Sequence, residues 1–111
     1  MSDEIPSITV GDVDELTDPV LLDVREADEY QAGHAPDVVW IPLNSLPEAM
    51  SDLPTDRTIL CICRVGGRSA QATAFLNDRG LDVVNLEGGM KAWEAFGLDV
   101  VRDDGSLGQV I

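Results

Sequence analysis

Cys63 begins the segment whose residue types best suit chemistry in this chain. The segment reads Cys63-Arg64-Val65-Gly66-Gly67-Arg68-Ser69. Its glycines let the backbone bend sharply, so that successive N–H groups converge into a cradle for an anion. The arginines and the first turn of a following helix place positive charge beside the sulfur, which favours the reactive thiolate over the thiol. The sequence therefore predicts that Cys63 is a nucleophile in an anion-binding loop rather than an inert strand residue.

Each arginine of the loop has more than one possible role. Arg64 directly follows Cys63 and is expected to be more exposed than Arg68, so we expect it to attract an anionic substrate. Arg68 could bind the same anion or pair with Asp23 or Glu87 to hold the loop in shape, and the sequence leaves both roles open. The predicted substrate-binding residues are Arg64, Val65, Gly66, Gly67 and Arg68.

Several polar residues and a second cysteine accompany this loop. Asp23 and Arg25 end a predicted strand and are expected near the loop, where they either support it or form a solvated ion pair. His34 is interpreted as a structural residue of a turn, because a thiolate that is already favoured needs no general base. Cys61 lies in an apolar run one residue before Cys63, a spacing unsuited to a disulfide, and is assigned to the core.

Apolar clusters predict strands that alternate with helices. The predicted strands are 7–10, 20–24, 38–41, 58–63 and 83–86. The predicted helices are 26–32, 45–51, 69–79 and 89–96. Helix 69–79 is expected to turn Ala72, Phe75 and Leu76 toward a sheet. Gly88 and Gly89 are expected to aim the N-terminus of the last helix at the Cys63 crevice. The near-continuous apolar strands indicate a parallel sheet buried on both faces, and therefore an α/β fold.

Length and composition narrow the class of protein further. The 111 residues suit one domain over 1–111, with a core of about 5–98 and an irregular, partly mobile extension over 99–111. There are 21 acidic and 7 basic residues, for a net charge of −14, which argues against nucleic acid as a partner. We hypothesise adaptation to high salt, the alternative being an ordinary acidic protein.

The histidine and cysteine counts and the lengths of the apolar runs predict whether the protein binds a metal or a membrane. One histidine and two closely spaced cysteines do not suit a metal site, and no cofactor is expected. No apolar run approaches the roughly 18 residues that a membrane span needs, and no signal peptide is recognised. We therefore expect a cytoplasmic protein without membrane contact.

Four segments resemble the recurring stretches of single-domain rhodaneses, in the same order and spacing. They are the Cys63 loop, residues 22–26, residues 33–42 and residues 85–93. The resemblance covers about residues 5–98 and implies a three-layer fold, with a five-stranded parallel sheet flanked by helices on both faces. Asp37 stands where the family usually has glycine, so the turn around His34 is expected to differ.

The resemblance also implies a reaction. Cys63 would take the outer sulfur of thiosulfate or a similar small anionic donor as a persulfide and pass it to cyanide or a thiol. Three alternatives stay open. They are a persulfide carrier that serves a biosynthetic partner protein, a non-catalytic binding module, and a cysteine-dependent phosphatase or arsenate reductase. The last is disfavoured because its loop is one residue longer between cysteine and arginine.

Overall fold

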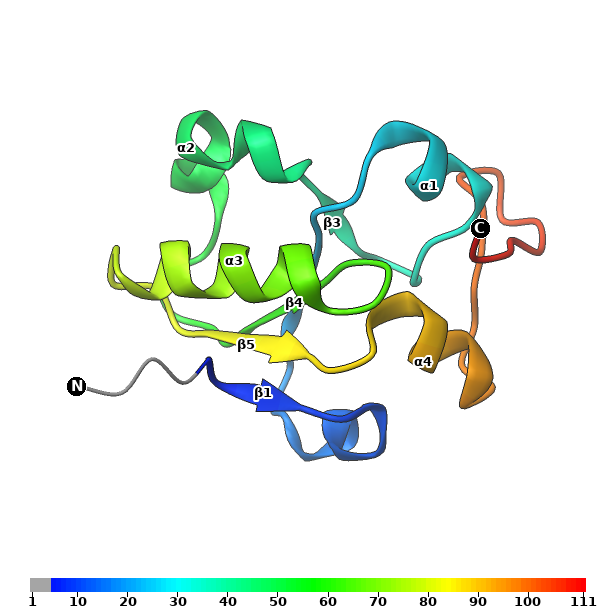
Figure 1. The fold of residues 1–111 in the computed structure, drawn as a ribbon, viewed down its shortest axis with the longest axis horizontal. Helices are drawn as coiled ribbons and strands as arrows, with labels where there is room; N and C mark the ends of the chain where they lie inside the picture. The colour runs from blue at the N-terminus through cyan, green and yellow to red at the C-terminus, as the bar shows by residue number, and fades with distance from the viewer. Residues whose placement is uncertain (1–4) are drawn as a thin grey trace.

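Five parallel strands form one sheet in the order β1-β5-β4-β2-β3 (Figure 1). The structure is a computed structural model in which residues 5–111 are described. The strands are β1 (Ser7–Ile8), β2 (Val20–Asp23), β3 (Val39–Trp40), β4 (Ile59–Ile62) and β5 (Val83–Leu86). The predicted five-stranded parallel sheet is therefore confirmed. The first strand is shorter than predicted, since the chain turns at Thr9, whose carbonyl accepts the Asp12 amide at 3.0 Å.

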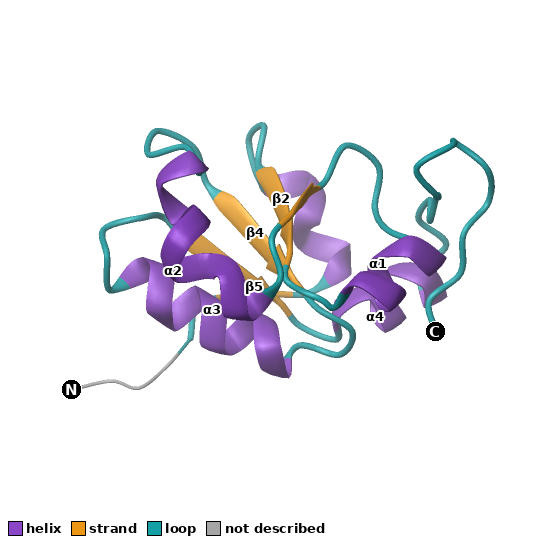
Figure 2. Ribbon diagram, turned by 90° about the horizontal axis from the view of Figure 1, so that it is seen from above, coloured by secondary structure: helices purple, strands orange, loops and turns teal. Residues whose placement is uncertain are grey.

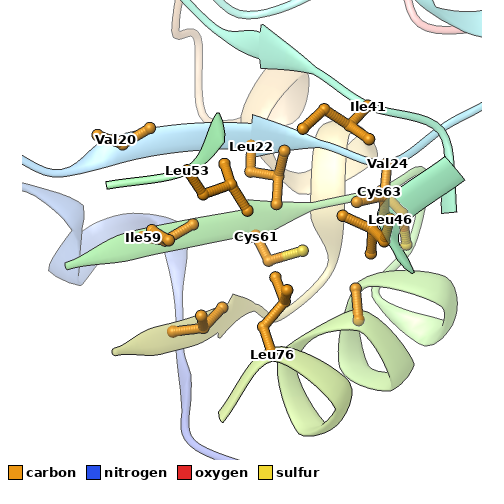
Figure 3. Packing of buried hydrophobic residues seen from close by; sticks show 12 residues of the cluster. Val20, Leu22, Val24, Ile41, Leu46, Leu53, Ile59, Cys61, Cys63 and Leu76 are labelled. Carbon is orange, nitrogen blue, oxygen red and sulfur yellow. The ribbon is translucent and has the colours of Figure 1, made fainter. Parts of the chain in front are cut away.

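The central strand β4 is apolar because it is covered on both sides. All four of its side chains are buried. Ile59 and Cys61 pack into one hydrophobic cluster (Figure 3), whereas Leu60 and Ile62 pack into another. Burying a large aliphatic side chain stabilises a fold by about 1.5–3 kcal/mol relative to leaving it exposed. The two clusters therefore hold the strand that leads to Cys63 firmly in place.

Helices lie on both faces of the sheet. They are α1 (Ala27–Ala32), α2 (Leu46–Ala49), α3 (Gly67–Asn77) and α4 (Gly89–Ala95). The helices α2 and α3 contribute to the cluster around Cys61 and lie together on one side of the sheet (Figures 1 and 2). Helix α4 contributes to the cluster on the opposite face. The three-layer arrangement expected from the sequence is thus present.

Three short 3-10 helices modify the predicted element boundaries. They are η1 (Val10–Glu15), η2 (Leu43–Ser45) and η3 (Met50–Asp52). The predicted helix 45–51 is therefore a chain of three short pieces, with Pro47 in the first turn of α2. Helix α3 begins two residues earlier than predicted, at Gly67. Its inward face includes Ser69 and Thr73 besides Ala72 and Leu76, whereas Phe75 is only partly buried.

The C-terminal segment 99–111 folds back over the body of the protein. Val101 forms an antiparallel bridge with His34, with its carbonyl accepting the His34 amide at 2.8 Å. The Gln109 amide donates to the Ala32 carbonyl at 3.0 Å, and Val110 is buried. This segment therefore packs against the end of α1. Within residues 5–111, no helix combines the length and the apolar character that crossing a membrane requires.

Candidate active site

Cys63 directly follows β4 at the carboxyl edge of the sheet, where parallel α/β sheets place their ligands. Its sulfur accepts hydrogen bonds from the Gly66 amide at 3.0 Å and the Ser69 hydroxyl at 3.3 Å. Gly66 precedes α3 with φ of 111°, a left-handed conformation that favours glycine. Cys63 itself is 1% exposed. The loop therefore wraps its donors around the sulfur atom.

Two opposing effects set the pKa of Cys63. Burial raises the pKa, and it is the largest single influence. The Ser69 hydroxyl and the amides of Ser69, Gly66 and Val65 together lower the pKa by more than burial raises it, so that the net change is downward. Hydrogen bonds to the charged form favour it. The thiolate is therefore the stabilised form, as the predicted nucleophile requires.

The start of α4 holds the backbone of the loop. The Met90 amide donates to the Cys63 carbonyl at 2.8 Å, and the Lys91 amide donates to the Arg64 carbonyl at 3.0 Å. Gly89 has φ of +54°, and a Cβ there would overlap the Cys63 carbonyl oxygen. The N-terminus of α4 therefore faces the Cys63 loop as expected, and its first amides bind carbonyls of the loop. These hydrogen bonds from α4 hold the backbone of the loop at Cys63 and Arg64 in place.

Arg68 pairs with Glu29, not with the predicted Asp23 or Glu87. Its Nη1 donates to Oε1 at 2.6 Å and its Nη2 donates to Oε2 at 2.8 Å. The Arg68 guanidinium lowers the pKa of Glu29 to about 2. The predicted partner was wrong because Arg25 already occupies both carboxylate oxygens of Asp23. Two roles were predicted for Arg68, namely binding an anion and holding the loop in shape. The ion pair with Glu29 favours the second role.

Arg64 and Val65 form the outer part of the loop. Arg64 is half-buried, and its Nε donates to the Ile111 carbonyl at 2.8 Å. Val65 is 57% exposed. The C-terminal segment therefore reaches the mouth of the predicted site.

Asp23 and Arg25 form a buried ion pair, and the solvated alternative is wrong. The Nη2–Oδ2 distance is 2.7 Å, and neither side chain is more than 1% exposed. Arg25 Nη2 also donates to the Gly33 carbonyl at 2.8 Å, and Trp40 Nε1 donates to the Arg25 carbonyl at 2.9 Å. The pair therefore links the end of β2 to the turn before His34.

His34 and Cys61 lie in structural surroundings. The His34 ring stacks on Tyr30 with centroids 4.1 Å apart, and its Nε2 lies 2.9 Å from Asp103 Oδ1. Cys61 is fully buried in the cluster of Figure 3, and burial raises the pKa of its thiol. Cys61 and Cys63 are both free thiols.

Two polar residues near the sulfur were not predicted as site residues. Ser69 is fully buried in the first turns of α3, and Asn85 is 5% exposed on β5. Ser69 Oγ lies 2.5 Å from Asn85 Oδ1. The sequence carries a signal for Asn85, since it is the one polar residue within the run Val83–Leu86. A buried amide in an apolar strand normally has a specific partner.

Comparisons with known proteins agree with this geometry. The rhodanese-like domain model matches residues 10–96. A sulfurtransferase of Allochromatium vinosum is 40% identical over 89 residues, which are 79% of this chain and 83% of that protein. The thiosulfate sulfurtransferase GlpE of Pseudomonas savastanoi pv. phaseolicola is 34% identical over 77 residues, which are 68% of this chain and 73% of that protein.

A solved structure agrees as well. The rhodanese-related protein of Thermoplasma volcanium superposes with a TM-score of 0.82 at 37% identity, over 86% of this chain and 97% of that one. The similarity therefore extends over most of both chains, in fold as well as in sequence. By both measures, this chain belongs to the rhodanese-like sulfurtransferase family.

Proposed function

We propose that this protein moves a sulfane sulfur from thiosulfate or a similar small anionic donor, through a persulfide on Cys63, to cyanide or a thiol. The observation that carries the proposal is the setting of Cys63 Sγ, which accepts hydrogen bonds from Gly66 and Ser69 at the edge of the sheet. A related protein named thiosulfate sulfurtransferase supports the choice of donor.

The reaction needs only a nucleophile and a site for negative charge. The Cys63 thiolate attacks the outer sulfur of thiosulfate and forms a new S–S bond. The S–S bond of the donor breaks, and sulfite leaves with the electron pair. Cyanide then attacks the outer sulfur of the persulfide, thiocyanate leaves, and the Cys63 thiolate is restored. Electrons balance within each half-reaction, so no external oxidant or reductant takes part.

The position and the ion pair of Arg68 favour sulfur transfer over phosphoryl transfer. Arg68 is held by both carboxylate oxygens of Glu29 and is therefore not directed at an incoming oxyanion. Only Arg64, Val65, Gly66 and Gly67 lie between Cys63 and Arg68, so the cradle is short. A single sulfur atom needs less room than a tetrahedral phosphoryl group.

A mass measurement tests the proposal directly. The protein is incubated with thiosulfate in molar KCl, its intact mass is measured, and cyanide is added while thiocyanate is assayed. We expect a gain of one sulfur atom that cyanide removes, no gain in Cys63→Ser, and an unchanged gain in the control Cys61→Ala. The absence of a gain in the wild type, or turnover of an aryl phosphate in its place, would refute the proposal.

A further inference from the structure

Three polar side-chain atoms lie in series beneath the loop. Cys63 Sγ is 3.3 Å from Ser69 Oγ, which is 2.5 Å from Asn85 Oδ1. Ser69 is fully buried and Asn85 is 5% exposed, so their hydrogen bonds must be satisfied mainly within the protein. The backbone of Asn85 is fixed in β5, where its backbone N–H donates to the Pro6 carbonyl at 2.7 Å. The series is therefore a built feature of the core beside the sulfur.

The Ser69 hydroxyl has one proton and two acceptors within reach. It can donate either to the Cys63 thiolate or to Asn85 Oδ1, but not to both at once. The amide of Asn85 carries a donor and an acceptor of nearly equal size, so a half-turn of the amide exchanges them. With Nδ2 toward Ser69, the amide donates to Oγ and frees the hydroxyl proton for the sulfur. With Oδ1 toward Ser69, the amide accepts the hydroxyl hydrogen bond in place of the sulfur.

We propose that Asn85 is a positioning residue for sulfur transfer, whose amide directs the Ser69 proton to Cys63 Sγ when that sulfur carries the negative charge, and withdraws it when the charge resides on the outer sulfur. This inference rests on the proposed persulfide reaction. The proton stays on Ser69 Oγ throughout, so only hydrogen bonds change and no bond to hydrogen breaks.

The two halves of the reaction use this pair differently. Once the persulfide forms, the charge lies on its outer sulfur and Sγ becomes a weak acceptor, so the hydroxyl turns to Asn85 Oδ1. When cyanide attacks the outer sulfur, Sγ leaves as a thiolate and needs the Ser69 hydrogen bond again. Stabilising a leaving group as its charge develops lowers the barrier of that step. The effect of Asn85 is therefore expected mainly in the release of sulfur.

Asn85→Asp is the informative variant, because a carboxylate of the same shape can only accept the Ser69 proton. Its own charge also raises the pKa of Cys63, and the Ser69→Ala background separates the two effects. Asn77→Asp is the matched control, since Asn77 also binds with its amide, to the backbone of Val83, away from the sulfur. Asn85→Leu serves as a second variant that keeps the number and branching of the side-chain heavy atoms without any charge or hydrogen-bonding group.

The measurements are the pH dependence of Cys63 alkylation and the single-turnover rate of thiocyanate release. We expect Asn85→Asp to raise the apparent pKa of Cys63 by about one unit and to slow release by about tenfold. Asn77→Asp is expected to change neither quantity. In the Ser69→Ala background the effect of Asn85→Asp should shrink at least severalfold, because the hydroxyl through which it acts is gone.

Two results would overturn the proposal. One is an Asn85→Asp effect of equal size with and without Ser69, which would assign it to charge alone. The other is an unchanged pH profile in both Asn85→Asp and Ser69→Ala. Asn85→Leu, which leaves the Ser69 proton no acceptor but the sulfur, should keep the pKa closer to the wild-type value than Asn85→Asp does. Alkylation needs no sulfur donor, so these results stand even if thiosulfate proves not to react.

Discussion

Arg68 and Glu29 join the first turn of α3 to α1 through two parallel hydrogen bonds of 2.6 and 2.8 Å. Glu29 Oε1 also accepts the backbone amide of Glu26 at 3.0 Å and so caps its own helix. One carboxylate therefore fixes the start of α1 and the end of the Cys63 loop together. This double duty makes Glu29 a sensitive point for the stability of the loop.

Replacing Glu29 should alter stability in a pH-dependent way. The folded-state pKa of Glu29 is lowered from 4.5 to about 2, mainly by the Arg68 hydrogen bond. A lowered pKa contributes stability that is present above pH 4.5 and is lost as the pH falls toward 2. Since Arg68 is 34% exposed, solvent screening reduces the contribution to about 2 kcal/mol.

We expect Glu29→Gln to lower the free energy of unfolding by about that amount at pH 7 and by little near pH 2. Urea unfolding at several pH values in constant salt measures the difference. Glu15→Gln, an exposed carboxylate on η1, is the control for the loss of charge alone. Equal losses at both pH extremes would contradict the ion-pair explanation.

The two cysteines should differ sharply in reactivity. Burial raises the pKa of Cys61, while the donors of the loop outweigh burial and lower the pKa of Cys63. Iodoacetamide is therefore expected to modify the native protein once, at Cys63, and to modify both thiols after unfolding. Peptide mass mapping identifies the site. Preferential modification of Cys61 in the native state would show that the loop does not activate Cys63.

Gly89→Ala should distort the backbone of the Cys63 loop where α4 packs against it. Gly89 has φ of +54°, and an added Cβ would collide with backbone atoms of Cys63 and Arg64. We expect a loss of about 2–4 kcal/mol in the free energy of unfolding, together with slower alkylation of Cys63. Gly11→Ala is the matched control, because its Cβ would meet only side-chain atoms, at 3.9 and 4.0 Å. Chemical denaturation and alkylation rates measure the two effects.

Arg64 should influence the approach of an anionic donor. Its guanidinium lies in the outer part of the Cys63 loop, where it adds local positive charge to a protein of net charge −14. We expect Arg64→Gln to raise KM for thiosulfate about fivefold at low salt, with a smaller effect in molar KCl. Arg57→Gln, whose partner Asp18 lies before β2, is the control. Initial-rate kinetics at two salt concentrations decide the outcome.

The acidic composition predicts a dependence of stability on salt. A net charge of −14 over 111 residues repels itself, and salt screens this repulsion. We expect Tm to rise by several degrees between low and molar KCl and to keep rising if the protein is adapted to high salt. Calorimetry measures this curve. A Tm that is independent of KCl would argue against the halophilic hypothesis.

Much of the site could be predicted because it is contiguous in the chain. The loop from Cys63 to Arg68 has its glycines and arginines within one short segment, and local backbone geometry already converges its amides. The strands were predictable for a similar reason, since β4 is an unbroken apolar run, which is typical of a parallel-sheet strand buried on both faces. Short 3-10 helices such as η1 were missed, because their periodicity is too brief to recognise.

The contacts that hold the loop could not be read from the sequence. Glu29 lies 39 residues from Arg68, and Asn85 lies 16 residues from Ser69. Which carboxylate reaches Arg68 depends on the strand order and on the angle at which α1 crosses the sheet. Apolar periodicity sets neither of these. The sequence by itself thus determined the fold class and predicted Cys63 as the nucleophile. The tertiary structure decided which distant side chains surround the sulfur, because such pairs form only once the sheet has brought their elements together.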